Sequence, residues 1–328
     1  MVSLFKILTK QLKPIAPLLI SIAILSLIYS KIDIDKLRSA IIDANILILA
    51  ISLSISIILG LVVGLRYFKF SYRLNIRPFP KYITSVKSYF LASCLNLFLP
   101  SKIGDLSKGL ICQRIDSLIY PTELHIFTLY EKLSDLFALI IIGIVVGVCK
   151  ISFIENDNFD KFIKYTNILN IQTVLTLIFL FAFIFLFLIL APYERLFLTS
   201  KIANILPKKL KDILSYANRF SWKEFAYFHG SSIIIWFIHL LQMVIFAYSL
   251  GMNLWNLSGL FVLISSVLIG LLPISLAGVG TRDASLVFFL SSLHGPEKPL
   301  LLGVLLTSRY IIPSIMGLLF IKDLRVRA

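Results

Sequence analysis

The chain has 328 residues, of which 58% are hydrophobic and only 15% are charged, and its mean hydropathy is +0.92. Soluble domains have roughly 45–50% apolar and about 25% charged residues, so this composition excludes an ordinary soluble domain and indicates an integral membrane protein. The net charge of +15 does not indicate nucleic-acid binding, because no RNA- or DNA-binding motif is present and the basic residues cluster beside apolar runs, as membrane orientation requires.

Neither a disulfide framework nor a metal site is expected. The three cysteines are odd in number and lie in or beside apolar runs, and the four histidines are not spaced with them as zinc ligands. The phosphate-binding pattern GxxxxGK[ST] is absent, so we expect no ATP-driven step in the chain itself. We therefore predict no metal and no cofactor.

The first apolar run covers residues 14–29 and follows three lysines. It has no small-residue cleavage site, so we interpret it as an uncleaved membrane span rather than a signal peptide. Residues 31–45 mix charged and apolar positions and are expected to lie at the membrane interface. Residues 46–65 are long enough to cross the bilayer core at about 1.5 Å per residue, and a strongly basic loop is expected over 66–87.

The next apolar stretch, 88–114, is interrupted by Pro100, Gly104 and Asp105, which predicts a re-entrant hairpin rather than a continuous span. Residues 123–148 are long enough for a membrane helix. Spacings of three and four place polar residues on one face of that helix, and they are Thr128, Glu131 and Asp135. We expect this face to point toward the inside of the protein.

The second half of the chain begins with residues 171–191, which are almost entirely Leu, Ile and Phe and predict a lipid-facing span. A long basic loop is expected over 192–224. The later apolar segments are 225–250, 256–272, 284–293 and 299–321. Of these, 284–293 is too short to cross a membrane alone.

The stretch LPISLAGVGTRD, residues 272–283, cannot form an ordinary spanning helix. Pro273 lacks a backbone N–H, and Gly278 and Gly280 can adopt backbone angles that other residues avoid, so the chain is expected to break and turn here. The stretch ends with a basic and an acidic residue, Arg282 and Asp283. Irregular backbone at membrane depth is tolerated only where it is buried in protein or lines a watery cavity, so we predict a second re-entrant hairpin and a functional site here.

These elements predict an all-α, polytopic membrane protein with about eight membrane segments in a single membrane domain. The two broken segments enter from opposite sides, as an inverted repeat with pseudo-repeats over about 1–150 and 171–328 would produce. Most Lys and Arg lie near the two termini and in the two basic loops, so both termini are predicted to be cytoplasmic. No soluble catalytic domain is expected.

Two arginines in the apolar segments are candidates for headgroup binding. Arg282 and Arg309 would suit bidentate contact with a phosphate. The alternative is that Arg282 pairs with Asp283 or another buried acid only to hold the hairpin. The same argument makes Lys102 and Asp105 candidates in the first broken segment.

The acidic face of the 123–148 helix also has two interpretations. Glu131, Lys132 and Asp135 could carry a proton or cation, or they could pair with the arginines and lysines of the two hairpins, as membrane-buried charges commonly do. The full set of candidate substrate-binding residues is Lys102, Gly104, Asp105, Glu131, Asp135, Gly278, Gly280, Arg282, Asp283 and Arg309.

Three short motifs follow one another along the chain: LPSKIGD (99–105), YEKLSD (130–135) and the stretch LPISLAGVGTRD. Together they resemble the family of the lysylphosphatidylglycerol synthase transmembrane region, often called flippase-like membrane proteins. The chain departs from the family pattern at three positions, where Ser101 replaces a glycine, Lys132 an arginine and Asp283 a glutamate. Each replacement keeps the chemical class or the small size, and the resemblance covers about residues 10–320.

The resemblance implies a protein without enzyme activity that binds or translocates a lipid with an anionic headgroup in a bacterial-type inner membrane. That lipid would be a phospholipid or a polyprenyl-linked saccharide. One alternative is a membrane subunit that presents a lipid substrate to a glycosyl- or aminoacyl-transferase, and another is a non-transporting scaffold in envelope-lipid synthesis. The expected partners are therefore a membrane lipid or lipid-linked glycan and, for these alternatives, a partner enzyme, with no nucleic acid.

Overall fold

Helices make up all the regular secondary structure that the computed structural model describes. The described residues are 16–30, 32–73, 80–96, 100–116, 121–152, 168–190, 219–272, 274–275 and 278–324. The prediction of an all-α protein is therefore confirmed for this part of the chain. Segments of high hydropathy and few breakers form the longest helices, as the composition requires.

Four helical segments in the described chain are long and apolar enough to cross a membrane. They are α4 (Ile46–Arg73), most of α7 (Pro121–Ser152), α12 (Trp222–Ser249) and the segment Glu297–Leu319, which contains α15 (Glu297–Ser308) and α16 (Ile311–Leu319). A fifth span results if α2 (Ala16–Tyr29) and α3 (Ile34–Ile42) are counted as one segment bent by 95°. The protein is thus a multi-pass membrane protein, while the count of about eight segments stays a prediction.

The contacts between residues divide the chain into two compact units, and each is described by itself. Unit 1 comprises residues 1–57, 93–104 and 242–315, and unit 2 comprises 58–92, 105–241 and 316–328. Each unit combines segments from both halves of the sequence. The single membrane domain and the inverted repeat stay predictions.

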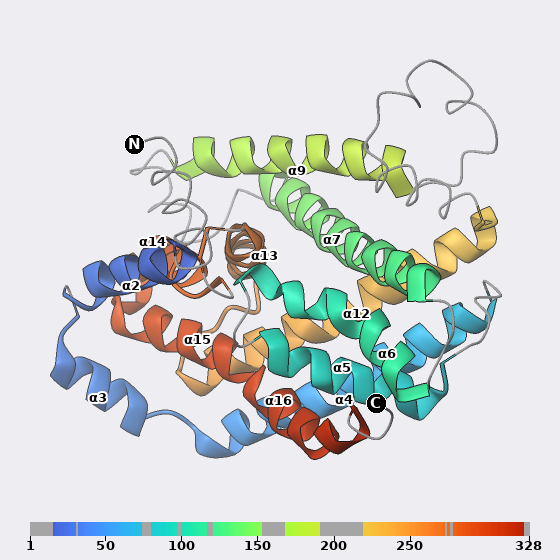
Figure 1. Cartoon of the computed structure of the whole chain (residues 1–328). Helices are drawn as coiled ribbons and strands as arrows, with labels where there is room; N and C mark the ends of the chain where they lie inside the picture. Colours follow the sequence, from blue (N-terminus) through green and yellow to red (C-terminus); the bar gives the residue numbers. More distant parts are fainter. Residues whose placement is uncertain are drawn as a thin grey trace, which may run out of the picture. The chain divides into compact units, whose positions relative to one another are not determined.

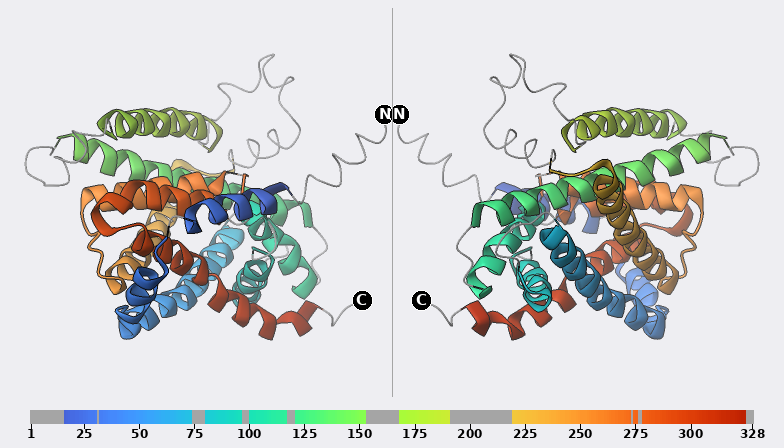
Figure 2. Two further views of the ribbon diagram at one scale, coloured as in Figure 1. Left: turned by 90° about the vertical axis from the view of Figure 1, so that its left-hand side faces the viewer. Right: turned by 90° about the vertical axis from the view of Figure 1, so that its right-hand side faces the viewer.

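Unit 1 contains the predicted break in residues 272–283. There α13 (Leu257–Leu271) ends and α14 (Thr281–His294) begins, with Gly278 and Gly280 at φ angles of 77° and 98°. Helix α14 packs on α13, on α15 and on α2, and α15 also contacts α3 (Figure 2). The break and its glycine-dependent turn are confirmed, although Pro273 lies outside the described residues. A re-entrant course through a membrane stays a prediction.

Unit 2 is organised around α7. Helix α6 (Lys108–Asp116) packs on it, and α9 (Ile168–Leu190) runs beside it (Figure 1). Stacked aromatic rings join α7 and α9, with 5.1 Å between the ring centroids of Phe137 and Phe183. The core between α4, α7 and α12 is also aromatic, because Tyr67, Phe127 and Phe228 are all fully buried.

The predicted interruption of 88–114 is also present. Helix α5 (Tyr82–Asn96) is followed in the described chain by the 3₁₀ helix η1 (Pro100–Ser107), which leads directly into α6. The basic loop expected over 66–87 is wrong at its start, because α4 continues to Arg73. Residues 66–73 include four aromatic side chains and no glycine or proline, so nothing in their chemistry ends the helix.

Candidate functional site

A network of buried charges lies inside unit 2, with Arg66 of α4 at its centre. One guanidinium nitrogen, Nη2, donates to Oε1 of Glu131 at 2.7 Å. The other, Nη1, donates to Oδ1 of Asp135 at 2.6 Å and to the hydroxyl of Ser232 at 2.8 Å. The side chains of Arg66 and Glu131 are 2% and 0% exposed, so this part of the network is closed to solvent.

Two lysines complete the network. Lys108 pairs with the second carboxylate oxygen of Glu131, and its ammonium nitrogen lies 4.1 Å from the ring centroid of Tyr67. Lys132 pairs with Asp105 at 2.8 Å and approaches Asp135 at 3.7 Å. Three basic side chains therefore face three acidic ones, and the network is formally neutral. It joins the motifs LPSKIGD and YEKLSD through the pair of Lys132 and Asp105.

The network has a closed side and an open edge. The side chain of Lys132 is 26% exposed and that of Asp105 is 19% exposed, in contrast to the buried pair of Arg66 and Glu131. A water-borne proton, cation or headgroup would therefore reach Lys132 before it reached Glu131. The geometry favours pairing for Glu131 and Asp135, and a role for them in substrate binding stays a prediction.

Two members of this network, Arg66 and Lys108, were not among the predicted site residues. The sequence interpretation ended the membrane span at 65 because a charge follows, but a charge that finds acidic partners does not have to leave the protein interior. Arg66 follows an apolar run and precedes Tyr67 and Phe68, and this aromatic continuation was the available signal. Lys108 lies four residues after Gly104, in a stretch whose apolar residues show no spacing from which its burial could be predicted.

In unit 1, two of the three guanidinium nitrogens of Arg282, Nε and Nη2, donate to groups of the protein. Its Nε and Nη2 donate to Oδ1 of Asp283 at 3.0 and 2.7 Å. Nη2 is also 2.7 Å from the Gly303 carbonyl oxygen and 2.7 Å from Oγ1 of Thr307. Asp283 accepts in addition from the backbone N–H of Gly280 at 3.1 Å, which fixes the start of α14. The interpretation in which Arg282 holds the hairpin is the one that this geometry supports.

Arg309 differs from Arg282 in lacking an acidic partner. It ends α15, it is only 4% exposed, and its Nη2 donates to the hydroxyl of Tyr310 at 2.6 Å. The same tyrosine ring lies 4.9 Å from the guanidinium carbon. Nε and Nη1 are buried without a hydrogen-bond partner, and within the described chain no ion pair involves this side chain. Arg309 is thus a buried cation with free donors.

The remaining candidate substrate-binding residues are glycines, residues already described in the network, or residues whose side chains the structure does not describe. Gly278 and Gly280 form the turn before α14, and Gly104 is a buried residue of η1. The side chain of Lys102 lies outside the described residues. Asp105 and Glu131 belong to unit 2, whereas Arg282 belongs to unit 1. An inverted repeat would bring the two broken segments together at one cavity, and this stays a prediction.

Several spanning helices with charged side chains paired inside the protein define a polytopic α-helical membrane protein with a polar interior. More particularly, the chain belongs to the family described as the lysylphosphatidylglycerol synthase TM region, whose model matches residues 15–317. The family resemblance inferred from the three motifs is confirmed. Comparisons with curated proteins and with solved structures found no match.

Proposed function

We propose that this protein binds a lipid with an anionic headgroup and moves it between the leaflets of a bacterial-type inner membrane. The observation that carries the proposal is the buried guanidinium of Arg309, which has unsatisfied donors and, among the described residues, no acidic partner. Charges held at membrane depth without internal partners are typical of substrate and ion pathways. Family membership supports the same conclusion.

The energetic balance at Arg309 favours an external anion. An arginine at the centre of a membrane helix costs about 2.5–3.5 kcal/mol on insertion scales. The helix dipole stabilises the charge by about 0.3–1 kcal/mol, because Arg309 lies at the C-terminal end of α15. The contact with the Tyr310 ring stabilises it by about 0.5–2 kcal/mol. Neither contribution supplies acceptors for Nε and Nη1, and buried donors without acceptors cost about 1–3 kcal/mol each. Phosphate oxygens would supply both the charge and the acceptors.

Of the two arginines that the sequence offered as headgroup ligands, only Arg309 keeps that role. Arg282 donates from Nε and Nη2 to Asp283, Gly303 and Thr307, so a phosphate that bound these two nitrogens would have to displace protein groups. At Arg309, by contrast, a phosphate would compete with no hydrogen-bond acceptor of the described chain at Nε and Nη1. We therefore assign headgroup recognition to Arg309 and the holding of the hairpin to Arg282.

The test uses purified protein with phosphatidylglycerol and, as the neutral comparison, phosphatidylcholine. Arg309→Gln removes the cation, and Arg219→Gln is the matched control, because Arg219 is half exposed and pairs with Glu123. We expect phosphatidylglycerol to raise the melting temperature of the natural protein and of the control but not of Arg309→Gln. A full lipid-dependent shift in Arg309→Gln would overturn the assignment.

Liposomes with labelled phosphatidylglycerol separate the three functional classes. A translocating protein moves the label across the bilayer, and Arg309→Gln should slow that movement while Arg219→Gln does not. A subunit that presents lipid to a transferase, or a scaffold, would bind the lipid without moving it. Binding without transbilayer movement would therefore end the transport proposal and leave those two alternatives.

The proposed orientation places both termini in the cytoplasm. Its support is the clustering of Lys and Arg near the termini and in the two basic regions, which persists although Arg66 belongs to the protein interior. The termini themselves lie outside the described residues. Reporter fusions at the carboxyl terminus should give a cytoplasmic signal, and an extracytoplasmic signal would contradict the orientation.

A further inference from the structure

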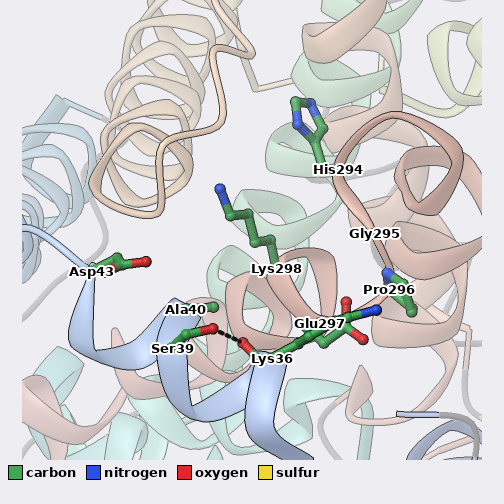
Figure 3. Close-up of a pocket in the computed structure, with 9 residues that line it drawn as sticks. All are labelled: Lys36, Ser39, Ala40, Asp43, His294, Gly295, Pro296, Glu297 and Lys298. Atoms are coloured by element: carbon green, nitrogen blue, oxygen red, sulfur yellow. Dashed lines mark hydrogen bonds between the residues drawn. The ribbon is translucent and has the colours of Figure 1, made fainter. Parts of the chain in front are cut away.

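A polar pocket of about 310 Å³ lies in unit 1, between α3 and the turn that joins α14 to α15 (Figure 3). It shares no residue with the buried charges described above. Its most informative lining residue is Glu297, the first residue of α15, which is only 7% exposed. No hydrogen bond or ion pair within the described chain neutralises this carboxylate.

The turn is shaped so that the Glu297 carboxylate lies against it. Gly295 has a φ of 71°, a conformation that residues with a side chain rarely adopt. A Cβ atom at this position would lie only 2.8 Å from Oε2 of Glu297. The positive φ of Gly295 and its lack of a Cβ atom therefore both allow the carboxylate to lie close to the turn. The N-terminal end of the α15 dipole offsets part of the cost of its negative charge but provides no cation.

In the described part of the chain, no basic residue around the pocket forms an ion pair with Glu297. The ammonium of Lys36 lies 3.8 Å from Asp33 and is largely exposed. The ammonium of Lys298 lies beside Gly251, where an added Cβ would be 3.5 Å away. Burial, and then the charge of Lys298, lower the pKa of His294 below its usual value, so this imidazole is mainly neutral at pH 7.

Oxygen acceptors and basic groups thus surround one space. Asp43 contributes a second carboxylate, and the Ser39 hydroxyl, which donates to the Lys36 carbonyl at 2.9 Å, keeps its lone pairs for another donor. We propose that the pocket binds a small zwitterion whose primary ammonium group pairs with Glu297 and whose phosphate or carboxylate lies near Lys298. A primary ammonium has three donors, which suits these acceptors, and a quaternary ammonium has none.

The same chemistry can come from a lipid headgroup or from a free solute. The binding test therefore uses phosphatidylethanolamine in detergent micelles and soluble O-phosphoethanolamine, with phosphatidylcholine as the quaternary comparison. We expect phosphatidylethanolamine, phosphoethanolamine or both to bind and phosphatidylcholine to bind at least about tenfold more weakly, as the loss of charge-assisted hydrogen bonds implies. Binding by phosphoethanolamine identifies the headgroup as sufficient, whereas binding by the lipid alone identifies a lipid site. Equal binding of phosphatidylcholine would overturn the proposal.

Glu297→Gln keeps the size of the side chain and removes its charge, and it should weaken this binding by about tenfold or more. Asp35→Asn is the control, because it neutralises an exposed acid of α3 that does not line the pocket. Ala40→Leu offers a second variant, since Ala40 lines the pocket and a larger side chain there should block the ligand without changing any charge. Unchanged binding in well-folded Glu297→Gln and Ala40→Leu proteins would overturn the proposal. The result is independent of the lipid transport proposed above, because Arg309→Gln should leave this binding intact.

Discussion

The buried charges of the unit 2 network are paired, whereas unit 1 contains, besides the pair of Arg282 and Asp283, two buried charges that are not paired within the described chain. In unit 2, Arg66, Lys108 and Lys132 each meet an acidic side chain within ion-pair distance. In unit 1, Arg309 and Glu297 are as thoroughly buried, yet no ion pair in the described chain involves either of them. A buried charge therefore indicates a ligand-binding site chiefly where no charge of the protein pairs with it.

The physical reason is the asymmetry between removing and replacing a partner. Removing one side of a buried ion pair strands the other charge and typically costs about 3–5 kcal/mol, whereas replacing an unmatched charge by an apolar side chain is neutral or stabilising. Substitutions in unit 2 should accordingly damage the fold, and substitutions at Arg309 should spare it. The following predictions test this contrast, beginning with the largest effect.

The largest effect is expected for Glu131→Ala. This change leaves Lys108 without its acidic partner and removes one of the two acids that pair with Arg66, which keeps Asp135. We expect destabilisation of at least about 3–5 kcal/mol and little accumulation of protein in the membrane. The measurement is the yield and melting temperature in detergent, with Asp35→Asn as a control. Normal yield and melting temperature for Glu131→Ala would show that the network does not hold unit 2 together.

The next effect is expected for Arg282→Ala, which strands Asp283 alone. The cost should be about 3 kcal/mol, at the lower end for a broken buried pair, because Asp283 keeps its hydrogen bond from the Gly280 N–H. Arg282→Lys should be milder, since it keeps the charge and loses only the fork that reaches Gly303 and Thr307. Melting temperatures of the two variants give the order. A stable Arg282→Ala protein that no longer binds phosphatidylglycerol would instead favour Arg282 as the headgroup ligand.

The sequence predicted those parts of the fold that depend on local chemistry. The break before Arg282 followed from proline and glycine, and the polar face with Glu131 and Asp135 followed from helical spacing. The partners could not be predicted, because Arg66 lies 65 positions from Glu131 and periodicity carries no information on which helices pack together. Glu297 was missed for a related reason, since an acid at a helix start is ordinarily exposed and only packing makes it buried.

A smaller effect is expected at the open edge of the unit 2 network. Lys132→Gln removes the partner of Asp105, but both side chains are partly exposed, so water replaces much of the lost interaction. We expect a cost of about 1 kcal/mol, which would lower the melting temperature only slightly. Calorimetry or a thermal-shift assay in detergent would measure it. A loss as large as that of Glu131→Ala would show that the network is closed throughout and has no edge accessible from solvent.

The smallest effect on stability is expected for Arg309→Met. Methionine keeps much of the apolar volume of the arginine stem while it removes a buried charge and the two unsatisfied donors, Nε and Nη1. The loss of the contacts with Tyr310 acts in the other direction, so the melting temperature without added lipid should be unchanged or slightly higher. In phosphatidylglycerol the order should reverse, because only the natural protein gains an anion at this position. A marked loss of stability in Arg309→Met without lipid would mean that the guanidinium is structural, and the contrast between the two units would then fail at the residue on which the proposed function depends.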